Sequence, residues 1–293
     1  MRRDSFEIAL PMIVSTFENN PSKAFTALDI RSIFFEYRDE WNIAAYRTDV
    51  HFEAFLQKKG ILNVFILNSN NDDSVKKVFL KPSGNNFDIA IAIKKEGFIS
   101  YYSALSFHGL TLQIPKTIYV SYPKSSPLSL NANGTNLTQE NIDNAFSKPQ
   151  RVSSQVFTSK IDNVKYVFIQ KKYTENDIGI IPIESIRISN LERTLIDITV
   201  RPVYSGGVFE VLNAYKASIG IIDTDLLYLY LTELDYIYPY FQLVGFYLEK
   251  AGFDQKDILK FQKKISEYRF YMTYNIANKS YDEKWKIYFP KGF

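Results

Sequence analysis

The stretch NLERTLIDITVRPVYSGGVFEVLNAYKAS, residues 190–218, decides how the C-terminal half of this chain is organised. A compact group of acidic and basic residues leads into an apolar helix, and a Gly-Gly pair separates that helix from a second one. Glu192 lies near the start of the first helix, where the helix dipole favours a negative charge. Asp197 and Arg201 are four residues apart, so we expect them to pair on one helix face.

Two interpretations of this group compete. In the first, Asp197 is a catalytic carboxylate with an arginine clamp; in the second, the charges fix the helix against the preceding run IESIRIS. We favour the second, because no nucleophile or second acid at metal-binding spacing accompanies the group, and the Gly-Gly pair lacks the Lys-Ser/Thr of a phosphate loop. We therefore assign structural roles to six residues: Glu192, Arg193, Asp197, Arg201, Gly206 and Gly207.

Composition limits the possible chemistry. The chain has 293 residues, enough for two domains, and 46% of them are hydrophobic. It has no cysteine, which excludes disulfides, thiolate nucleophiles and Cys-ligated metals. The 2 histidines, His51 and His108, are too few for a His-rich metal site. We expect His108 to be a packed or hydrogen-bonded residue at a helix end.

The N-terminal segment has the order of a winged helix-turn-helix. Apolar periodicity predicts helices over residues 4–19 and 27–40, and a third that begins at Thr48 with Asp49 in its first turn. The strand-like runs ILNVFILNS and VKKVFLKP then flank the polar tip NSNNDDS. We therefore predict an α+β protein, with a winged-helix DNA-binding domain over residues 1–84 and a mixed α/β domain with a mainly helical end over residues 85–293.

The third helix is the candidate recognition helix, because in this motif the second helix of the pair enters the major groove. Asp49 and Glu53 argue against contact with phosphates, and the alternative is a solvated face on a small helical subdomain. The candidate DNA-binding residues on this helix and beside the hairpin are Arg47, Thr48, His51, Lys58, Lys59, Lys76 and Lys77.

Charge is distributed unevenly along the chain. The net charge is only +3, and residues 1–84 are neutral, with 11 basic and 11 acidic side chains. Residues 85–172 carry 10 basic against 5 acidic residues. We expect part of this excess to face the same DNA, with dispersed solubilising lysines as the alternative. The candidates are Lys94, Lys95, Lys116, Lys124, Lys148, Arg151, Lys171 and Lys172.

Patterns for enzymes and membrane proteins are weak. Asp88 and Lys94 lack the intervening acid of a nuclease core, the DEK triplet that begins at Asp282 has no partner acid, and the DTD triplet that begins at Asp223 suits a helix cap. We therefore predict no catalytic residue, no metal and no cofactor. No apolar run approaches the roughly 18 residues of a membrane span, and the N-terminus lacks a signal-peptide pattern, so we expect a cytoplasmic protein.

Four motifs, in order along residues 99–290, resemble the AbiEi family, which comprises antitoxins and transcriptional repressors of type IV toxin–antitoxin systems. They are ISYYSALSFHGL, NLERTLIDITVRP with its following Gly-Gly pair, FQLVGFYLEKAG and YDEKWKIYFP. The chain departs from the family's pattern in its N-terminal half, where the second helix is acidic and the hairpin tip is rich in Asn and Asp.

The resemblance implies a function. Such a protein would bind inverted repeats in its own promoter and would counter a nucleotidyltransferase toxin without forming a stable complex with it. It would not be an enzyme and would have duplex DNA as its partner. The alternative is a nucleic-acid-processing phage-defence enzyme with an unfamiliar active site.

Overall fold

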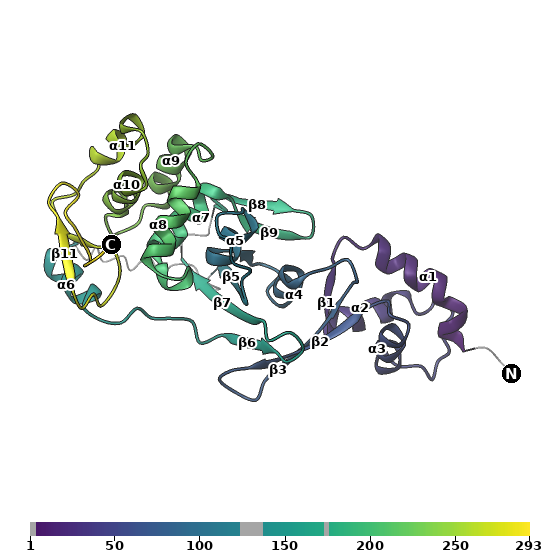
Figure 1. The fold of residues 1–293 in the computed structure, drawn as a ribbon. Helices are drawn as coiled ribbons and strands as arrows, with labels where there is room; N and C mark the ends of the chain where they lie inside the picture. The colour runs from purple at the N-terminus through teal and green to yellow at the C-terminus, as the bar shows by residue number, and fades with distance from the viewer. Residues whose placement is uncertain (1–3, 124–136, 173–175) are drawn as a thin grey trace.

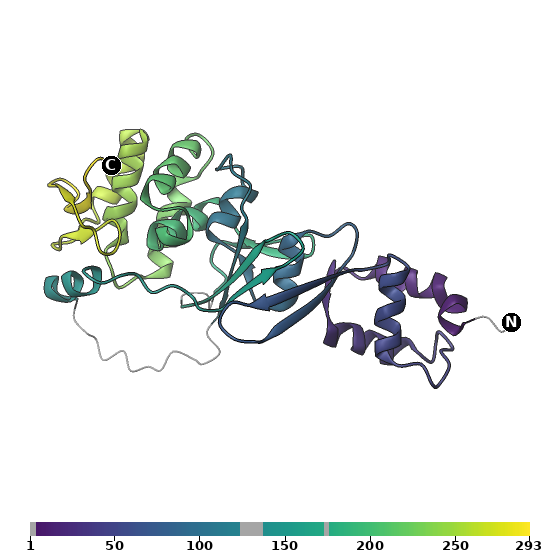
Figure 2. The same cartoon turned by 60° about the horizontal axis from the view of Figure 1, so that its bottom comes forward.

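The computed structural model describes residues 4–123, 137–172 and 176–293. It is a mixed α+β protein with one nine-stranded sheet and one three-stranded sheet. Three N-terminal helices lie at one end of an elongated molecule, the large sheet occupies the middle, and most of the remaining helices gather at the other end (Figures 1 and 2). The sequence correctly predicted the α+β class and the helical C-terminal part.

The helices and strands follow the chain order below. The described helices are α1 (Ser5–Asn19), α2 (Ala27–Tyr37), α3 (Asp49–Lys58), α4 (Asn86–Ile93), α5 (Tyr101–Phe107), α6 (Gln139–Phe146), α7 (Leu191–Val200), the 3-10 helix η1 (Pro202–Tyr204), α8 (Val208–Ala217), α9 (Thr224–Leu234), α10 (Tyr240–Ala251) and α11 (Gln255–Gln262). The described strands are β1 (Ala24–Thr26), β2 (Asn63–Ser69), β3 (Val75–Leu80), β4 (Phe98–Ile99), β5 (Thr117–Pro123), β6 (Val156–Ser159), β7 (Lys165–Lys171), β8 (Ile180–Ile183), β9 (Ile186–Ser189), β10 (Phe270–Tyr271), β11 (Lys279–Asp282) and β12 (Ile287–Pro290).

The helices α1, α2 and α3, which we call the N-terminal helical unit, share a core rich in aromatic side chains. Phe6 of α1, Phe34 of α2 and Phe52 of α3 are fully buried, with Phe52 at 5.7 Å from Phe6 and 5.4 Å from Phe34 between ring centroids. Thr26 and Thr48 begin α2 and α3 with capping boxes. The predicted start of the third helix at Thr48 is therefore confirmed.

The hairpin of β2 and β3 pairs with another strand on each of its two sides. On one side β3 pairs with the short strand β1, which the sequence patterns did not predict. On the other side β2 pairs antiparallel with β6, so that Leu67 lies opposite Ser159 and Ser69 opposite Phe157. The large sheet therefore runs without interruption across the predicted domain boundary at residue 84.

The large sheet has the strand order β1-β3-β2-β6-β7-β5-β4-β9-β8. The pairs β5·β7 and β4·β9 are parallel, and the other pairs are antiparallel. Successive residues of β7 face opposite sides, because side chains alternate along a strand. Tyr166 and Phe168 join the core beneath α4, whereas Val167 and Ile169 join the core of the C-terminal helices.

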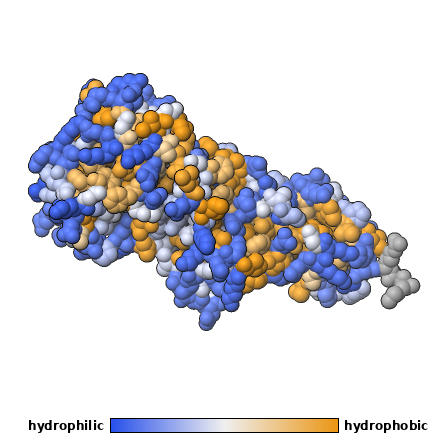
Figure 3. Space-filling view, in the orientation of Figure 1, coloured by the Kyte–Doolittle hydropathy of each residue, from blue (hydrophilic) through white to orange (hydrophobic). Residues whose placement is uncertain are grey.

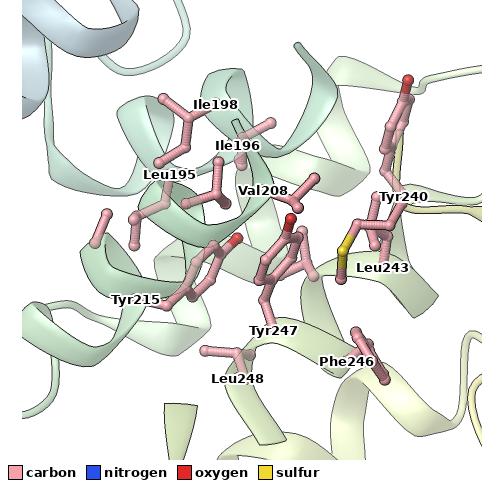
Figure 4. Close-up of a cluster of buried hydrophobic side chains, with 14 of the residues drawn as sticks. Leu195, Ile196, Ile198, Val208, Tyr215, Tyr240, Leu243, Phe246, Tyr247 and Leu248 are labelled. Atoms are coloured by element: carbon pink, nitrogen blue, oxygen red, sulfur yellow. The ribbon is translucent and has the colours of Figure 1, made fainter. Parts of the chain in front are cut away.

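The C-terminal helices pack around a second aromatic core (Figure 4). Tyr215 of α8 and Tyr247 of α10 lie face to face, with ring centroids 5.1 Å apart. The Tyr215 hydroxyl bonds the Thr199 hydroxyl at 2.8 Å, which ties α8 to α7. Trp285, fully buried, lies against Gly245 of α10, where a β-carbon would meet its ring at 2.2 Å.

A membrane-crossing helix is not found within the described ranges, where each helix is too short or too polar.

Candidate functional site

Helix α3 presents a polar face to solvent while its apolar face fills the N-terminal core. Phe52, Phe55 and Leu56 are buried, as predicted, but the assignment of Val50 to the same apolar face is wrong, because Val50 is 68% exposed. Thr48 accepts a hydrogen bond from the backbone N–H of His51, and the Nδ1 atom of His51 lies 3.2 Å from the backbone nitrogen of Thr48. These two predicted DNA contacts thus begin the helix, and both remain exposed.

Three of the predicted DNA-binding cations are ion-paired within the protein. Arg47 pairs with Asp4, and its guanidinium carbon lies 5.2 Å from the centre of the Phe6 ring. Lys59 lies 2.8 Å from Glu7, and Lys77 pairs with Glu53. Each pair ties two elements of the N-terminal part together. The other two predicted cations, Lys58 and Lys76, are exposed.

The two carboxylates that argued against a nucleic-acid interface are ion-paired within the protein. Asp49 lies 3.5 Å from Arg31 on α2, and its side chain is 28% exposed. Glu53 pairs with Lys77, and its side chain is 17% exposed. Each carboxylate therefore has a cationic partner on a neighbouring element of the same chain.

The sequence analysis missed part of the exposed face of α3. Val50 is 68% exposed, and Ala54 and Gln57 are exposed beside the predicted His51 and Lys58. Positions 50, 54, 57 and 58 follow helical spacing on the side opposite the buried phenylalanines. That spacing was available in the sequence, but Val50 was assigned to the apolar face because it is hydrophobic, and a search for charged residues passes over Ala54 and Gln57.

The hairpin tip is bound to the central sheet. The backbone N–H of Asn70 donates to the carbonyl of Val156 at 2.9 Å, and the Thr158 hydroxyl donates to the Asn70 side chain at 2.8 Å. Asn71 bonds the carbonyl of Ser154. The polar tip is therefore held in place by residues that lie more than 80 positions further along the chain.

The stretch at residues 190–218 holds a buried charge cluster, formed by Lys171, Arg193 and Asp197. The side chains of Arg193 and Asp197 are 0% exposed and that of Lys171 is 10% exposed. Arg193 Nε donates to Asp197 Oδ1 at 2.9 Å, and Lys171 also pairs with Asp197. The predicted Asp197–Arg201 pair is wrong: among the described residues, Asp197 pairs with Arg193 and Lys171. Arg193, four residues before Asp197, takes the place of Arg201 as its partner, and Lys171 at the end of β7 supplies the second cation.

Burial and pairing shift the pKa values within the charge cluster in characteristic directions. Burial would raise the pKa of Asp197, but Arg193 and Lys171 together hold it below its ordinary value. Burial is the strongest influence on Lys171 and lowers its pKa to about 7, although Asp197 opposes this shift. The cluster therefore keeps Asp197 ionised and makes Lys171 titrate far below an exposed lysine.

The other residues of this stretch bond locally. Glu192 accepts a hydrogen bond from the backbone N–H of Asp223 at 3.0 Å, which joins α7 to the start of α9. Gly206 and Gly207 have φ of 79° and 95°, and Gly207 precedes α8 directly, as the predicted turn requires. Arg201 ends α7 and lies over the Tyr204 ring, 6.0 Å from its centre.

The members of the predicted basic surface in the middle of the chain have different environments. Lys171 is buried in the charge cluster, so its inclusion in a DNA-facing surface is wrong. Lys95 pairs with Asp29 of α2, and Lys94 lies 4.4 Å from the centre of the Tyr122 ring. Lys124 lies outside the described residues. The other members are exposed: Lys116, Lys148, Arg151 and Lys172.

A cavity of about 440 Å³ opens beside the charge cluster. Lys171, Lys172 and Arg201 supply its cationic wall, and five tyrosines line the rest together with Ile169, Gln170, Val200 and Ile237. The tyrosines are Tyr101, Tyr236, Tyr238, Tyr240 and Tyr274. We call this cavity the tyrosine pocket. The sequence analysis did not find it, because its walls come from five separated segments.

The acidic residues considered for enzymatic chemistry have structural partners. Asp88 accepts from the backbone N–H of Asn85 at the start of α4. Asp223 begins α9, as predicted, and accepts from the backbone N–H of Asp225 at 2.8 Å. His108 ends α5 with Nε2 at 2.7 Å from the carbonyl of Ser189, as expected. Within the described ranges, no three His, Asp or Glu side chains gather in a way that would hold a metal ion.

Comparisons with known proteins bear on the fold. No family model matches the chain, and no curated protein is significantly similar in sequence. Among solved structures, the chain is similar to the Rv2827c protein of Mycobacterium tuberculosis, with a TM-score of 0.57 and 11% sequence identity over 99% of this chain and 93% of that one. At this identity the likeness shows that the fold is shared.

Proposed function

We propose that this protein binds duplex DNA through the exposed face of α3, represses transcription from its own promoter, and serves as the antitoxin of a toxin–antitoxin pair. The observation that carries the DNA-binding part is the free polar face of α3, whose neighbouring carboxylates are both paired inside the protein. The order helix, strand, two helices and hairpin supports a winged-helix unit.

The exposed side chains of α3 suit the major groove. The small apolar side chains of Val50 and Ala54 match the methyl groups of thymine, and the Gln57 amide can pair with the edge of adenine. Lys58, one residue further, can bind a phosphate. Such a mixture of apolar, amide and cationic groups is more typical of a base-reading surface than of a simply solvated helix.

The hairpin has a restricted role in this proposal. Because its tip is bonded to residues 154–158, it would approach the DNA as a rigid extension of the large sheet. Lys76 is exposed on β3 and would hold a backbone phosphate, whereas Lys77 remains paired with Glu53. The hairpin would therefore position the protein, and α3 would read the sequence.

Binding to the upstream promoter tests the DNA-binding part. A duplex of that sequence should shift in a gel at low salt, and a scrambled duplex of equal length should bind more weakly. Gln57→Ala should cost about 1–3 kcal/mol on the promoter duplex and little on the scrambled duplex. Gln255→Ala is the matched control, because Gln255 is an exposed glutamine on α11. Equal binding of both duplexes by the unmodified protein would rule out sequence-specific repression.

The antitoxin part rests on the motifs at residues 99–290 that resemble the AbiEi family. It predicts that the gene beside this one encodes a nucleotidyltransferase-like toxin. Expression of that toxin alone should stop growth, and co-expression of this protein should restore it. Restored growth without co-purification of the two chains fits the proposal; continued arrest at equal toxin levels contradicts it.

A further inference from the structure

The tyrosine pocket has the size and enclosure of a small-molecule site. Its volume of about 440 Å³ falls within the roughly 300–1,000 Å³ typical of ligand pockets. It lies between β7, the end of α7 and the segment that joins α9 to α10, far along the chain from the residues of α3. The proposed DNA contacts leave this site unexplained.

The charge of the pocket favours an anion. Lys171, Lys172 and Arg201 line it, and Asp197, which lies behind Lys171, is already bonded to Arg193. Lys171 is ion-paired with Asp197 and its Nζ atom is buried, so the exposed Lys172 and the partly exposed Arg201 are the cations that an anionic ligand would contact.

The aromatic wall favours a planar ring. Tyr274 stacks on Phe146 with ring centroids 4.3 Å apart, and Tyr238 lies 5.3 Å from the same phenylalanine. Tyr238 also stacks on Phe270 at 5.9 Å. These rings are therefore fixed from behind by the core, so that a ligand would meet a rigid stacking surface and lose little free energy in ordering it.

Tyr101 adds backbone strain at the pocket. Its φ is 52°, in the left-handed region that bulky side chains avoid, and the residue is 1% exposed. Its ring lies 5.3 Å from Lys171 Nζ, so the unusual backbone places an aromatic face against the buried ammonium group. Strain of this kind is concentrated at binding sites and switch regions.

A smaller pocket adjoins the first and extends its cationic wall. It has a volume of about 280 Å³ and shares Ile169, Gln170 and Arg201 with the tyrosine pocket. Arg151 also lines it. Arg201 therefore lines two neighbouring pockets, of which one is rich in rings and the other is more polar.

We infer that the tyrosine pocket binds a mononucleotide: the base would stack against the tyrosines, and the phosphate would be held by Lys172 and Arg201. This activity goes beyond the proposed DNA binding and does not depend on it. The rings match a planar base, the cations match a phosphate, and the volume suits one nucleotide better than a polymer.

Calorimetric titration of the full-length protein tests this inference. AMP, GMP, CMP and UMP are the probes, with adenosine and inorganic phosphate as partial ligands. At least one mononucleotide should bind with a dissociation constant in the roughly micromolar range, and each partial ligand should bind about tenfold or more weakly. Absence of binding by all four mononucleotides would overturn the inference.

Variants of the cationic lining residues test whether a mononucleotide binds in the tyrosine pocket or elsewhere on the protein. Arg201→Gln and Lys172→Gln should each weaken mononucleotide binding about tenfold, because a bond to a charged group is lost. Lys165→Gln, at the opposite end of β7, is the matched control and should bind normally. Thermal unfolding identifies any variant that has lost its fold, and Lys172→Gln, which is exposed, keeps the test valid if Arg201→Gln is unstable.

Two further results would count against the pocket. Unchanged binding in both Arg201→Gln and Lys172→Gln would place the nucleotide elsewhere. Binding of a single-stranded oligonucleotide, but of no mononucleotide, would mean that the cationic wall belongs to a nucleic-acid groove. Promoter binding that survives in Lys172→Gln while mononucleotide binding is lost would show that the two activities are separate.

Discussion

Lys171, Arg193 and Asp197 place two cations and one anion inside the protein, in a region where isolated charges are unfavourable. Burying charges costs several kcal/mol for each ion, and close pairing recovers this only when the geometry is good. Here Asp197 serves both cations, and Arg193 also donates to the carbonyl of Ile178 at 2.7 Å. The cluster therefore fixes α7 relative to β7 and to the segment before β8.

Replacing the Asp197 carboxylate should show how much the charge cluster stabilises the fold. Asp197→Asn keeps the shape of the side chain but leaves the buried Arg193 guanidinium without its carboxylate, so the free energy of unfolding should fall by about 3–5 kcal/mol. Urea unfolding at pH 7 measures it. The matched control is Asp254→Asn, because Asp254 is exposed and its contact with Lys256, at 3.9 Å, is long and open to solvent. Equal stability of the two variants would contradict a structural role for the charge cluster.

Lys171 should make stability depend on pH. Its pKa is about 7 in the folded protein and near 10.5 when unfolded, so between these values the unfolded chain binds more protons. Stability contributed by this residue must therefore rise with pH, at up to about 1.4 kcal/mol per pH unit. Asp197, Arg193 and Arg201 face Lys171 but keep their charge throughout this range.

Urea unfolding between pH 7 and 9 tests this prediction against Lys171→Met. The difference in unfolding free energy should shift with pH in favour of the unmodified protein. The range stops at pH 9, because buried tyrosines such as Tyr215 have raised pKa values and reverse the trend once unfolded tyrosines ionise near pH 10. Parallel curves for the two proteins would mean that Lys171 titrates like an exposed lysine.

At the scale of elements, α10 shows how close packing depends on one glycine. A β-carbon on Gly245 would lie 2.2 Å from the Trp285 ring and 2.9 Å from Phe261. The helix would gain about 1 kcal/mol of propensity from Gly245→Ala, but overpacking costs typically about 1–3 kcal/mol. We expect net destabilisation in thermal unfolding, and recovery when Trp285→Phe is combined with it. A stabilised Gly245→Ala variant would contradict this packing.

Several elements were predictable because their signals are local. Thr48 begins α3 and Asp223 begins α9, each through a side chain that bonds the first helical turn. Strand β1 has three residues, too few for a recognisable alternation. The pairing of β2 with β6 joins residues about 90 positions apart, and no local pattern encodes it.

The contrast between local and long-range signals also explains which parts of the candidate sites could be predicted from the sequence. The exposed face of α3 follows helical spacing, so its location was predictable even though Val50 was assigned to the buried face and Ala54 and Gln57 were overlooked. Lys171 and Asp197 lie on separate elements and meet only in the folded chain, which is why Lys171 was assigned to the surface. The tyrosine pocket needed the whole fold, because its lining residues span positions 101–274.

At the scale of the whole molecule, the large sheet couples the N-terminal helical unit to the rest. One face of the hairpin contributes Phe79 to the N-terminal core, and the other contributes Leu67, Val78 and Leu80 to the core beneath α4. A fragment of residues 1–84 would therefore keep its helical core but expose a second apolar face.

This arrangement predicts how fragments behave. Residues 1–84 should associate in a concentration-dependent way in sedimentation experiments. A fragment of residues 1–97, which includes α4 over that apolar face, should associate less. If residues 1–84 remain monomeric and as stable as the longer fragment, the hairpin does not need α4, and the boundary at residue 84 would separate independent domains.

The central claim, that the exposed face of α3 contacts promoter DNA, is tested most directly by the salt dependence of promoter binding. Fluorescence anisotropy would compare the unmodified protein with Lys58→Gln and with Lys256→Gln, an exposed lysine on α11 that belongs to neither candidate DNA-binding set. Loss of one phosphate contact should reduce the slope of log K against log salt by about 0.9. The account predicts this reduction for Lys58→Gln alone. An unchanged slope in Lys58→Gln, or no duplex binding at low salt, would contradict it.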